Sequence, residues 1–93
     1  MTYSLTLDAE EDLIRIYRYG EGKFGQTQAL KYYLGLIEHF ERIAENPYQF
    51  VSVAHIKPDY RSCNFKSDTI YYTVTDNVLI VAIIGRQDIE GKL

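Results

Sequence analysis

Apolar and polar side chains alternate strictly at the start of the chain and again in its C-terminal half. At the start, Tyr3, Leu5 and Leu7 share one face while threonine and serine occupy the other. This alternation is typical of a strand that is buried on one side only. Four segments are predicted to be strands on this pattern or as a continuous apolar run: residues 2–7, 61–65, 69–75 and 78–84.

Between the first and second of these segments, apolar residues recur every three or four positions, as they do on one face of a helix. Asp8, followed three residues later by Glu11, has the capping-box pattern and predicts the start of the first helix. Gly25 predicts its end, and Asn46-Pro47 predicts the end of a second helix. A connection this short makes the two helices an antiparallel hairpin. The apolar stripes are Ala9, Leu13, Ile16, Gly20 and Phe24, then Ala29, Tyr33, Leu36, Phe40 and Ile43.

The order strand, helix, helix, strand, strand, strand predicts an α+β fold, β-α-α-β-β-β. In this fold a helical hairpin packs on one face of a mostly antiparallel sheet. The 93 residues, 46% of them hydrophobic, are enough for a single domain, residues 1–93, with one core. Residues 48–60 are expected to form an irregular connection with room for a short extended piece. Tyr71 is expected to point away from the helices, together with the polar residues of its strand.

The last strand departs from the alternating pattern, because Leu79, Val81 and Ile83 are as apolar as the residues between them. Two helices cover only one face of a sheet. Either this strand is central in a twisted sheet and both of its faces are buried, or an apolar stripe on it is exposed to solvent. Open apolar patches on small proteins often mark interaction sites. We therefore take Leu79, Val81 and Ile83 as candidate partner-binding residues.

Charge and composition exclude several classes of function. The net charge of -3 disfavours direct, sequence-specific binding of nucleic acid, which depends on a surplus of basic groups. The single cysteine, Cys63, rules out an internal disulfide, and His39 and His55 lack further ligands at metal-binding spacing. Residues 78–84, the longest apolar run, are too few for a membrane helix. We expect a cytoplasmic protein with no cofactor, no metal and no membrane contact.

Ribonuclease chemistry without a metal needs a base, an acid and cations around the phosphate. The sheet region offers Arg61, Lys66 and Arg86 as cations and the two tyrosines of residues 69–75 as weak acids, but no histidine or glutamate. These cations and tyrosines are too few to make a convincing catalytic site. Arg86 and Asp88, which follow the last strand, fit a recognition pair at the end of the sheet better than a catalytic pair.

The chain resembles ParE-type toxins of the ParE/RelE superfamily of bacterial toxin–antitoxin systems, in both its helical half (residues 9–47) and its sheet half (residues 59–88). In the sheet half the resemblance is carried by Arg61, Ile70, Tyr72, Arg86 and Asp88. In the helical half it is carried by Ala9, Asp12-Leu13, Ile16, Tyr19, Phe24-Gly25, Gln28-Ala29, Tyr32, Leu36 and Asn46-Pro47.

The resemblance implies a non-enzymatic toxin that poisons DNA gyrase, blocks replication and is neutralised by a cognate ParD-like antitoxin. The open apolar stripe and the many tyrosines fit such protein–protein contacts. The candidate target-binding residues are Arg61, Tyr72, Arg86 and Asp88. The candidate antitoxin-binding residues are Leu79, Val81, Ile83 and Tyr17.

Two departures from the family pattern keep alternatives open. Val81 and Ile84 stand where many relatives have arginine and histidine, so the last strand lacks two polar side chains. These losses disfavour the first alternative, a RelE-like ribosome-dependent mRNA endoribonuclease. The second alternative is a toxin-like fold that still binds antitoxin but has lost or changed its target.

Overall fold

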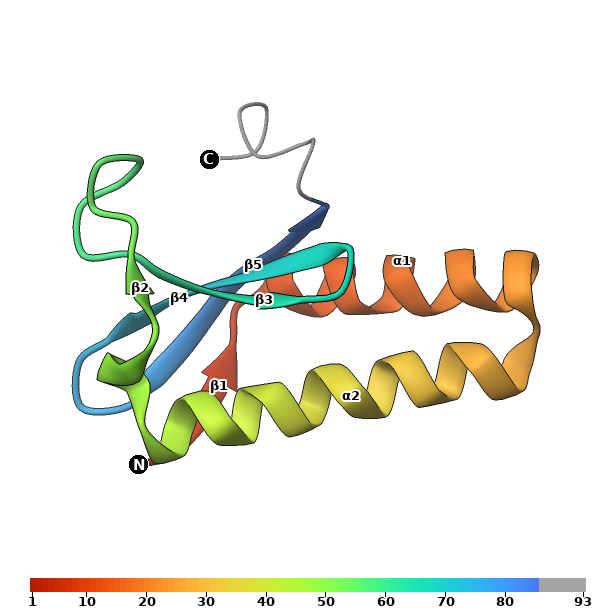
Figure 1. Ribbon diagram of the computed structural model, residues 1–93, viewed down its shortest axis with the longest axis horizontal. Coiled ribbons are helices and arrows are strands. Elements are labelled where there is room, and N and C mark those ends of the chain that lie inside the picture. Colours follow the sequence, from red (N-terminus) through yellow and green to blue (C-terminus); the bar gives the residue numbers. More distant parts are fainter. Residues whose placement is uncertain (86–93) are drawn as a thin grey trace.

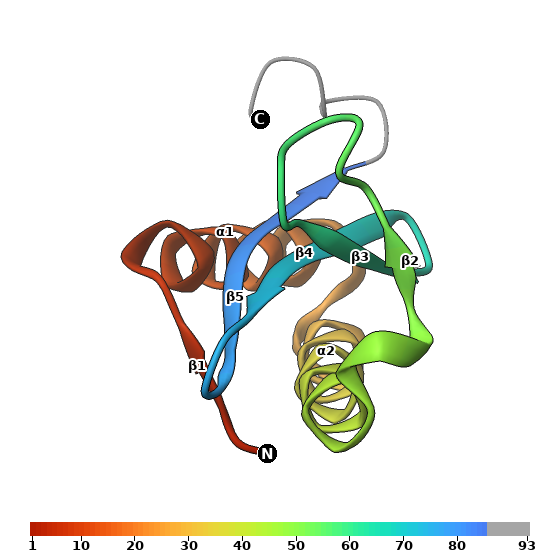
Figure 2. The same ribbon diagram turned by 90° about the vertical axis from the view of Figure 1, so that its left-hand side faces the viewer.

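The computed structural model describes residues 1–85, where a helical hairpin packs against one face of a five-stranded sheet of order β1-β5-β4-β3-β2 (Figures 1 and 2). β1 pairs parallel to β5, and all other pairings are antiparallel. The predicted α+β class is confirmed, with a two-residue strand added inside the connection. The elements are β1 (Tyr3–Leu5), α1 (Leu7–Phe24), α2 (Gln26–Glu45), the 3-10 helix η1 (Pro47–Gln49), β2 (Val51–Ser52), β3 (Arg61–Phe65), β4 (Asp68–Val74) and β5 (Val78–Gly85).

The junction between β1 and α1 corrects the predicted helix start, because the N-cap is Thr6 and not Asp8. The Thr6 hydroxyl oxygen accepts a hydrogen bond from the backbone N–H of Ala9 at 3.1 Å. The backbone N–H of Thr6 meanwhile donates to the Ile80 carbonyl at 3.0 Å, so the chain leaves the sheet at this residue. Asp8 lies in the first turn, where its charge suits the helix dipole. Leu7 belongs to the helix and is 77% exposed, not part of a strand face.

The main core lies between the hairpin and the sheet. Leu36 and Phe40 of α2 pack there with Tyr72 of β4 and Ile80 of β5, all without exposed surface. The hairpin is longer than the sheet and projects beyond it (Figure 1). Phe24, predicted to continue the buried stripe of α1, lies at the end of this projection and is 62% exposed. Its helical spacing is right, but no strand reaches far enough to cover it.

A β-bulge in β5 changes which side chains face the core. Tyr71 pairs with Ala82 and Tyr72 pairs with Ile80, so Val81 is an extra residue in the ladder. An extra residue reverses the alternation beyond it. Ile83 therefore turns into the main core and has no exposed surface, contrary to its predicted place on an open stripe.

The face of the sheet away from the helices is also partly covered. Val53 and Tyr60, from the connection before β3, pack over Tyr71, Ala82 and Ile84. The connection is folded back on itself, since the Val53 N–H donates to the Tyr60 carbonyl at 2.8 Å. Tyr71, predicted to point away from the core, is consequently buried in this second, smaller cluster.

Helix α2 lies close to Phe65 of β3 at Gly35. A Cβ atom built on Gly35 would lie 2.5 Å from Cζ of Phe65. The Phe65 ring has little freedom to retreat, because Tyr32 and His39 pack against it at centroid distances of 4.9 and 4.6 Å. The absence of a side chain at position 35 therefore sets the distance between helix and sheet.

We predict that Gly35→Ala destabilises the fold whereas Gly22→Ala stabilises it. Overpacking against Phe65 should cost about 1–3 kcal/mol, and the roughly 1 kcal/mol gained from alanine's helix propensity offsets only part of that cost. Gly22 is the matched control, because an added Cβ would meet nothing within 4 Å. Chemical denaturation of the wild type and both variants measures the difference. Equal stabilisation by both substitutions would show that the close contact at Gly35 does not constrain the fold.

Candidate functional site

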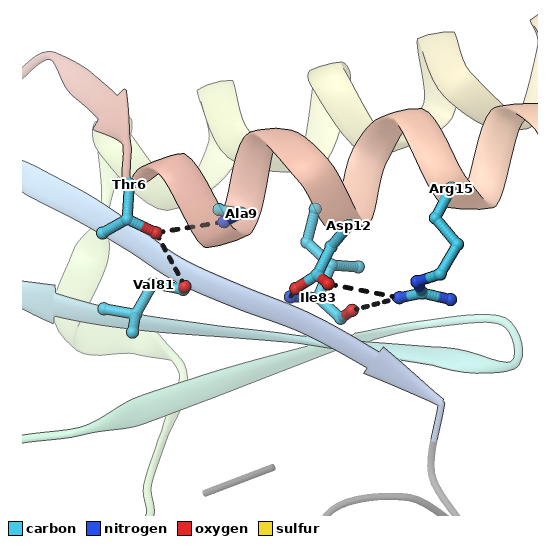
Figure 3. Close-up of polar contacts among 6 residues, drawn as sticks. All are labelled: Thr6, Ala9, Asp12, Arg15, Val81 and Ile83. Carbon is cyan, nitrogen blue, oxygen red and sulfur yellow. Dashed lines mark hydrogen bonds and ion pairs between the residues drawn. The ribbon is translucent and has the colours of Figure 1, made fainter.

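Helix α1 takes the place of a neighbouring strand along the outer part of β5. β1 has three residues and pairs only with residues 78–80, although β5 continues to Gly85. Beyond that pairing, α1 runs beside β5, and polar side chains reach from the helix to the strand backbone (Figure 3). The helix thus covers a strand edge that would otherwise be open to other chains.

Three side chains form this attachment. The Thr6 hydroxyl donates to the Val81 carbonyl at 2.9 Å, and Oδ2 of Asp12 accepts from the Ile83 N–H at 3.0 Å. Nη2 of Arg15 donates to the Ile83 carbonyl at 3.3 Å and to Oδ1 of Asp12 at 3.4 Å. The Asp12 side chain is 13% exposed and that of Arg15 is 52% exposed. Asp12 is therefore an internal anchor, while Arg15 remains accessible from solvent.

A cleft of about 630 Å³ opens where the hairpin projects beyond the sheet. Ile16, Tyr19 and Phe24 of α1 form one wall, Tyr32 of α2 lies opposite, and Asp68 of β4 marks the end of the sheet. Arg15 also lines this cleft. The walls are mainly apolar and aromatic, with a few polar groups at one end, which is the composition usual for binding sites.

The polar end of the cleft is held by Tyr32 and Asp68. The Tyr32 hydroxyl donates to Oδ2 of Asp68 at 2.6 Å, and Lys66 Nζ lies 5.7 Å from the centroid of the tyrosine ring. Burial, followed by the hydrogen bond to Asp68, raises the pKa of Tyr32 to about 12. At neutral pH the phenol therefore stays protonated and acts as a fixed donor to the carboxylate.

Arg61, a predicted target contact, is used inside the fold. Its Nη1 donates to the Phe50 carbonyl at 2.8 Å, and its guanidinium lies 5.1 Å from the centroid of the Tyr48 ring. Both partners belong to the segment between α2 and β3. The side chain is half-buried, so its main contacts hold that connection against the sheet.

Tyr72, a second predicted target contact, is wholly buried in the main core. It pairs with Arg61 across the ladder, and its hydroxyl donates to the Pro47 carbonyl. Burial raises the pKa of Tyr72 to about 12. The other two predicted target residues, Arg86 and Asp88, lie outside the described residues.

The candidate antitoxin-binding residues do not form one surface. Leu79, 37% exposed, and half-buried Val81 lie on the face away from the helices, whereas Ile83 lies in the main core. Tyr17 is on the opposite side, in α1, where its ring meets that of Tyr33 edge-on at 6.1 Å between centroids. The bulge in β5 and the two separate layers account for this dispersal.

Sequence reasoning missed the Asp12–Arg15 attachment and the cleft. A spacing of three residues on a helix is that of an ordinary surface pair, and nothing in it indicates β5 as a partner. Among residues 1–85, no group of three histidine, cysteine, aspartate or glutamate side chains is placed to hold a metal ion. No helix in the same part of the chain is both long and apolar enough to cross a bilayer.

Comparison with known proteins gives the family. A model of the ParE toxin of the type II toxin–antitoxin system parDE matches residues 3–90. Toxin ParE1 of Caulobacter vibrioides is 32% identical over 82 residues, 88% of this chain and 85% of that protein. The structure of a chromosomal ParDE system from P. aeruginosa matches with a TM-score of 0.80 at 20% identity, covering 91% of this chain and 95% of that one. The resemblance seen in the sequence is confirmed: the chain belongs to the ParE family of type II toxin–antitoxin toxins.

Proposed function

We propose that this toxin inhibits DNA gyrase by protein–protein contact, without enzymatic activity, and that a ParD-like antitoxin neutralises it in the bacterial cytoplasm. The observation that carries the proposal is the apolar surface of the projecting hairpin. Tyr19 and Phe24 are large and exposed there and line the cleft, and Leu30 and Leu34 of α2 are large and exposed as well. An apolar surface of this kind on so small a chain is typical of a protein interaction site.

The side chains of the sheet are better suited to a toxin that acts by binding a protein than to a toxin that cleaves RNA. The tyrosines that could serve as acids, Tyr71 and Tyr72, are both buried, and burial raises the pKa of each. A catalytic acid or base works best with a pKa near the working pH. His39, one of the two histidines, lies on α2 with Nδ1 2.9 Å from the Gly35 carbonyl and its ring against Phe65, and it is not one of the residues that line the cleft.

Neutralisation by an antitoxin is supported by the size and composition of the cleft. Its apolar walls and the exposed side chains of the hairpin would be shielded together by an amphipathic segment laid along the two helices. Leu79 and Val81, on the other face of the sheet, remain candidates for a further part of a wrapping antitoxin. Arg86 and Asp88 remain our proposed contacts to the target.

The first prediction concerns the target. The purified toxin should inhibit supercoiling by DNA gyrase or trap cleaved DNA with it, and should leave ribosome-bound mRNA intact. Arg86→Ala should weaken the inhibition roughly thirtyfold if Arg86 is an interface anchor. Arg86→Lys should recover only part, because lysine lacks the planar donor fork. Gyrase supercoiling assays and primer extension on ribosome-bound mRNA provide the readouts.

Two outcomes would favour the alternatives. Ribosome-dependent cuts in mRNA together with normal gyrase activity would support the RelE-like endoribonuclease. Antitoxin binding without an effect on gyrase or on mRNA would support a toxin-like fold with a lost or changed target. A thermal unfolding curve of Arg86→Ala that matches the wild type is the control for folding.

The second prediction concerns the phenols. Tyr32 and Tyr72 should release their protons only near pH 12, and Tyr32→Phe and Tyr72→Phe should each remove one late step from a phenolate absorbance titration. A raised pKa in the folded state means that the associated stability is complete below about pH 10, the value for unfolded tyrosine, and is lost as the pH rises toward 12. A Tyr72 phenol that titrates near pH 7 would instead make it a credible catalytic acid.

The third prediction concerns the antitoxin. A partner that binds only the folded toxin stabilises it by about 2.7 kcal/mol at a concentration 100 times its Kd. For a domain of this size each kcal/mol raises Tm by roughly 4–8 °C. Thermal unfolding with the antitoxin encoded beside the toxin measures the shift, with an unrelated acidic protein as control. An unchanged Tm at saturation would contradict the proposed partnership.

A further inference from the structure

Arg15 lies where two hollows of the surface meet. It lines the cleft between the helices and the end of the sheet. It also lines a shallower hollow on the outer side of α1, together with Glu11, Ile14, Arg18 and Tyr19. A partner segment that crosses α1 from one hollow to the other would therefore pass over its guanidinium.

The guanidinium of Arg15 already has hydrogen-bond partners on one side in the free toxin. Both of its hydrogen bonds use Nη2, which donates to Asp12 and to the Ile83 carbonyl of β5. Figure 3 shows this nitrogen facing Asp12 and Ile83 and another on the opposite side of the guanidinium. Within residues 1–85, Nε and Nη1 donate to no protein acceptor. Side chains ordered in advance lose less entropy on binding, which favours affinity.

The charges along α1 indicate which chemistry would bind here. The first turns of the helix are acidic, with Asp8, Glu10, Glu11 and Asp12, and the turns from Arg15 onward carry Arg15, Arg18 and Lys23 with a single acid, Glu21. Exposed Ile14 and Tyr19 lie among the basic residues. The stretch from Arg15 to Lys23 is thus complementary to a segment that carries both a negative charge and apolar side chains.

We propose that Arg15 is a recognition residue that binds a carboxylate of the antitoxin. The free edge of its donor fork would take an aspartate or glutamate side chain, as arginine does in paired geometries. Apolar residues on either side of that acid would pack on Ile14 and Tyr19 and enter the cleft. The inference rests on the proposed neutralisation by an antitoxin and names the chemistry of the partner at that site.

The test compares two exposed arginines, one on each helix. Arg15→Gln removes the charge and keeps a polar side chain, and Arg42→Gln removes an equal charge on α2, outside both hollows. Calorimetric titration with the antitoxin encoded beside the toxin should show a loss of about tenfold to thirtyfold for Arg15→Gln. Arg42→Gln should lose no more than about threefold, and Arg15→Lys should fall between the wild type and Arg15→Gln.

A double-mutant cycle then identifies the carboxylate. Each acidic residue of the antitoxin is replaced by its amide and titrated against the wild type and Arg15→Gln. One replacement should weaken binding to the wild type about tenfold and leave binding to Arg15→Gln unchanged. Thermal unfolding of each toxin variant, with Tm within a few degrees of the wild type, shows that the loss is one of recognition.

Several results would overturn the inference while leaving antitoxin binding intact. These are wild-type affinity for Arg15→Gln, equal losses for Arg15→Gln and Arg42→Gln, or no acidic residue coupled to Arg15. If the free toxin self-associates and Arg15→Gln abolishes that association, Arg15 binds a second copy of the chain and not the antitoxin. A wild type that binds no antitoxin would instead contradict the proposed function.

Discussion

The attachment of α1 to the edge of β5 is the contact on which the rest of the structure depends. β5 has eight residues and its neighbour β1 has three, so much of one edge of β5 would be exposed without the helix. Thr6 ends the strand, caps the helix and bonds the β5 backbone. Asp12 continues this attachment six residues further along the chain. A hydrogen bond that involves a charged group contributes roughly 1.5–3 kcal/mol, so these bonds fix the direction of α1 and with it the hairpin and the cleft.

The bulge at Val81 lies beside this attachment and decides which surfaces remain for partners. Because the ladder gains one residue there, Ile83 enters the main core and Ile84 joins the smaller cluster on the other face. Both faces of the end of β5 are then covered. The apolar surface available for binding is found mainly on the projecting hairpin, where the helices extend past the strands that would bury them.

The sequence was enough to predict the type and order of the main elements, because helical and strand periodicities are local signals. It could not distinguish Thr6 from Asp8 as the cap, since both residue types serve that purpose and the choice depends on where β1 leaves the sheet. Periodicity does not reveal a β-bulge, so Ile83 was predicted to lie on an open stripe although it lies in the core. Periodicity also does not show how far a sheet extends, so Phe24 was predicted to be buried although it is exposed. Arg61 and Tyr72 were singled out by the family resemblance, and their side-chain chemistry suits an internal bond to the connection as well as it suits a partner.

Asp12 and Arg15 divide two tasks between adjacent turns of one helix. The shielded bond from Asp12 to β5 is shorter and belongs to the fold, whereas the exposed bonds of Arg15 are longer and contribute less to stability, as surface pairs do. Arg15 can therefore serve recognition at little cost to folding. Such a division allows the exposed face of α1 to change with its partner while the attachment to β5 is kept. The match at 20% identity and a TM-score of 0.80 shows that this fold tolerates extensive substitution. Anchors such as Thr6 and Asp12, and not the charges on the outer face, are where that tolerance should be smallest.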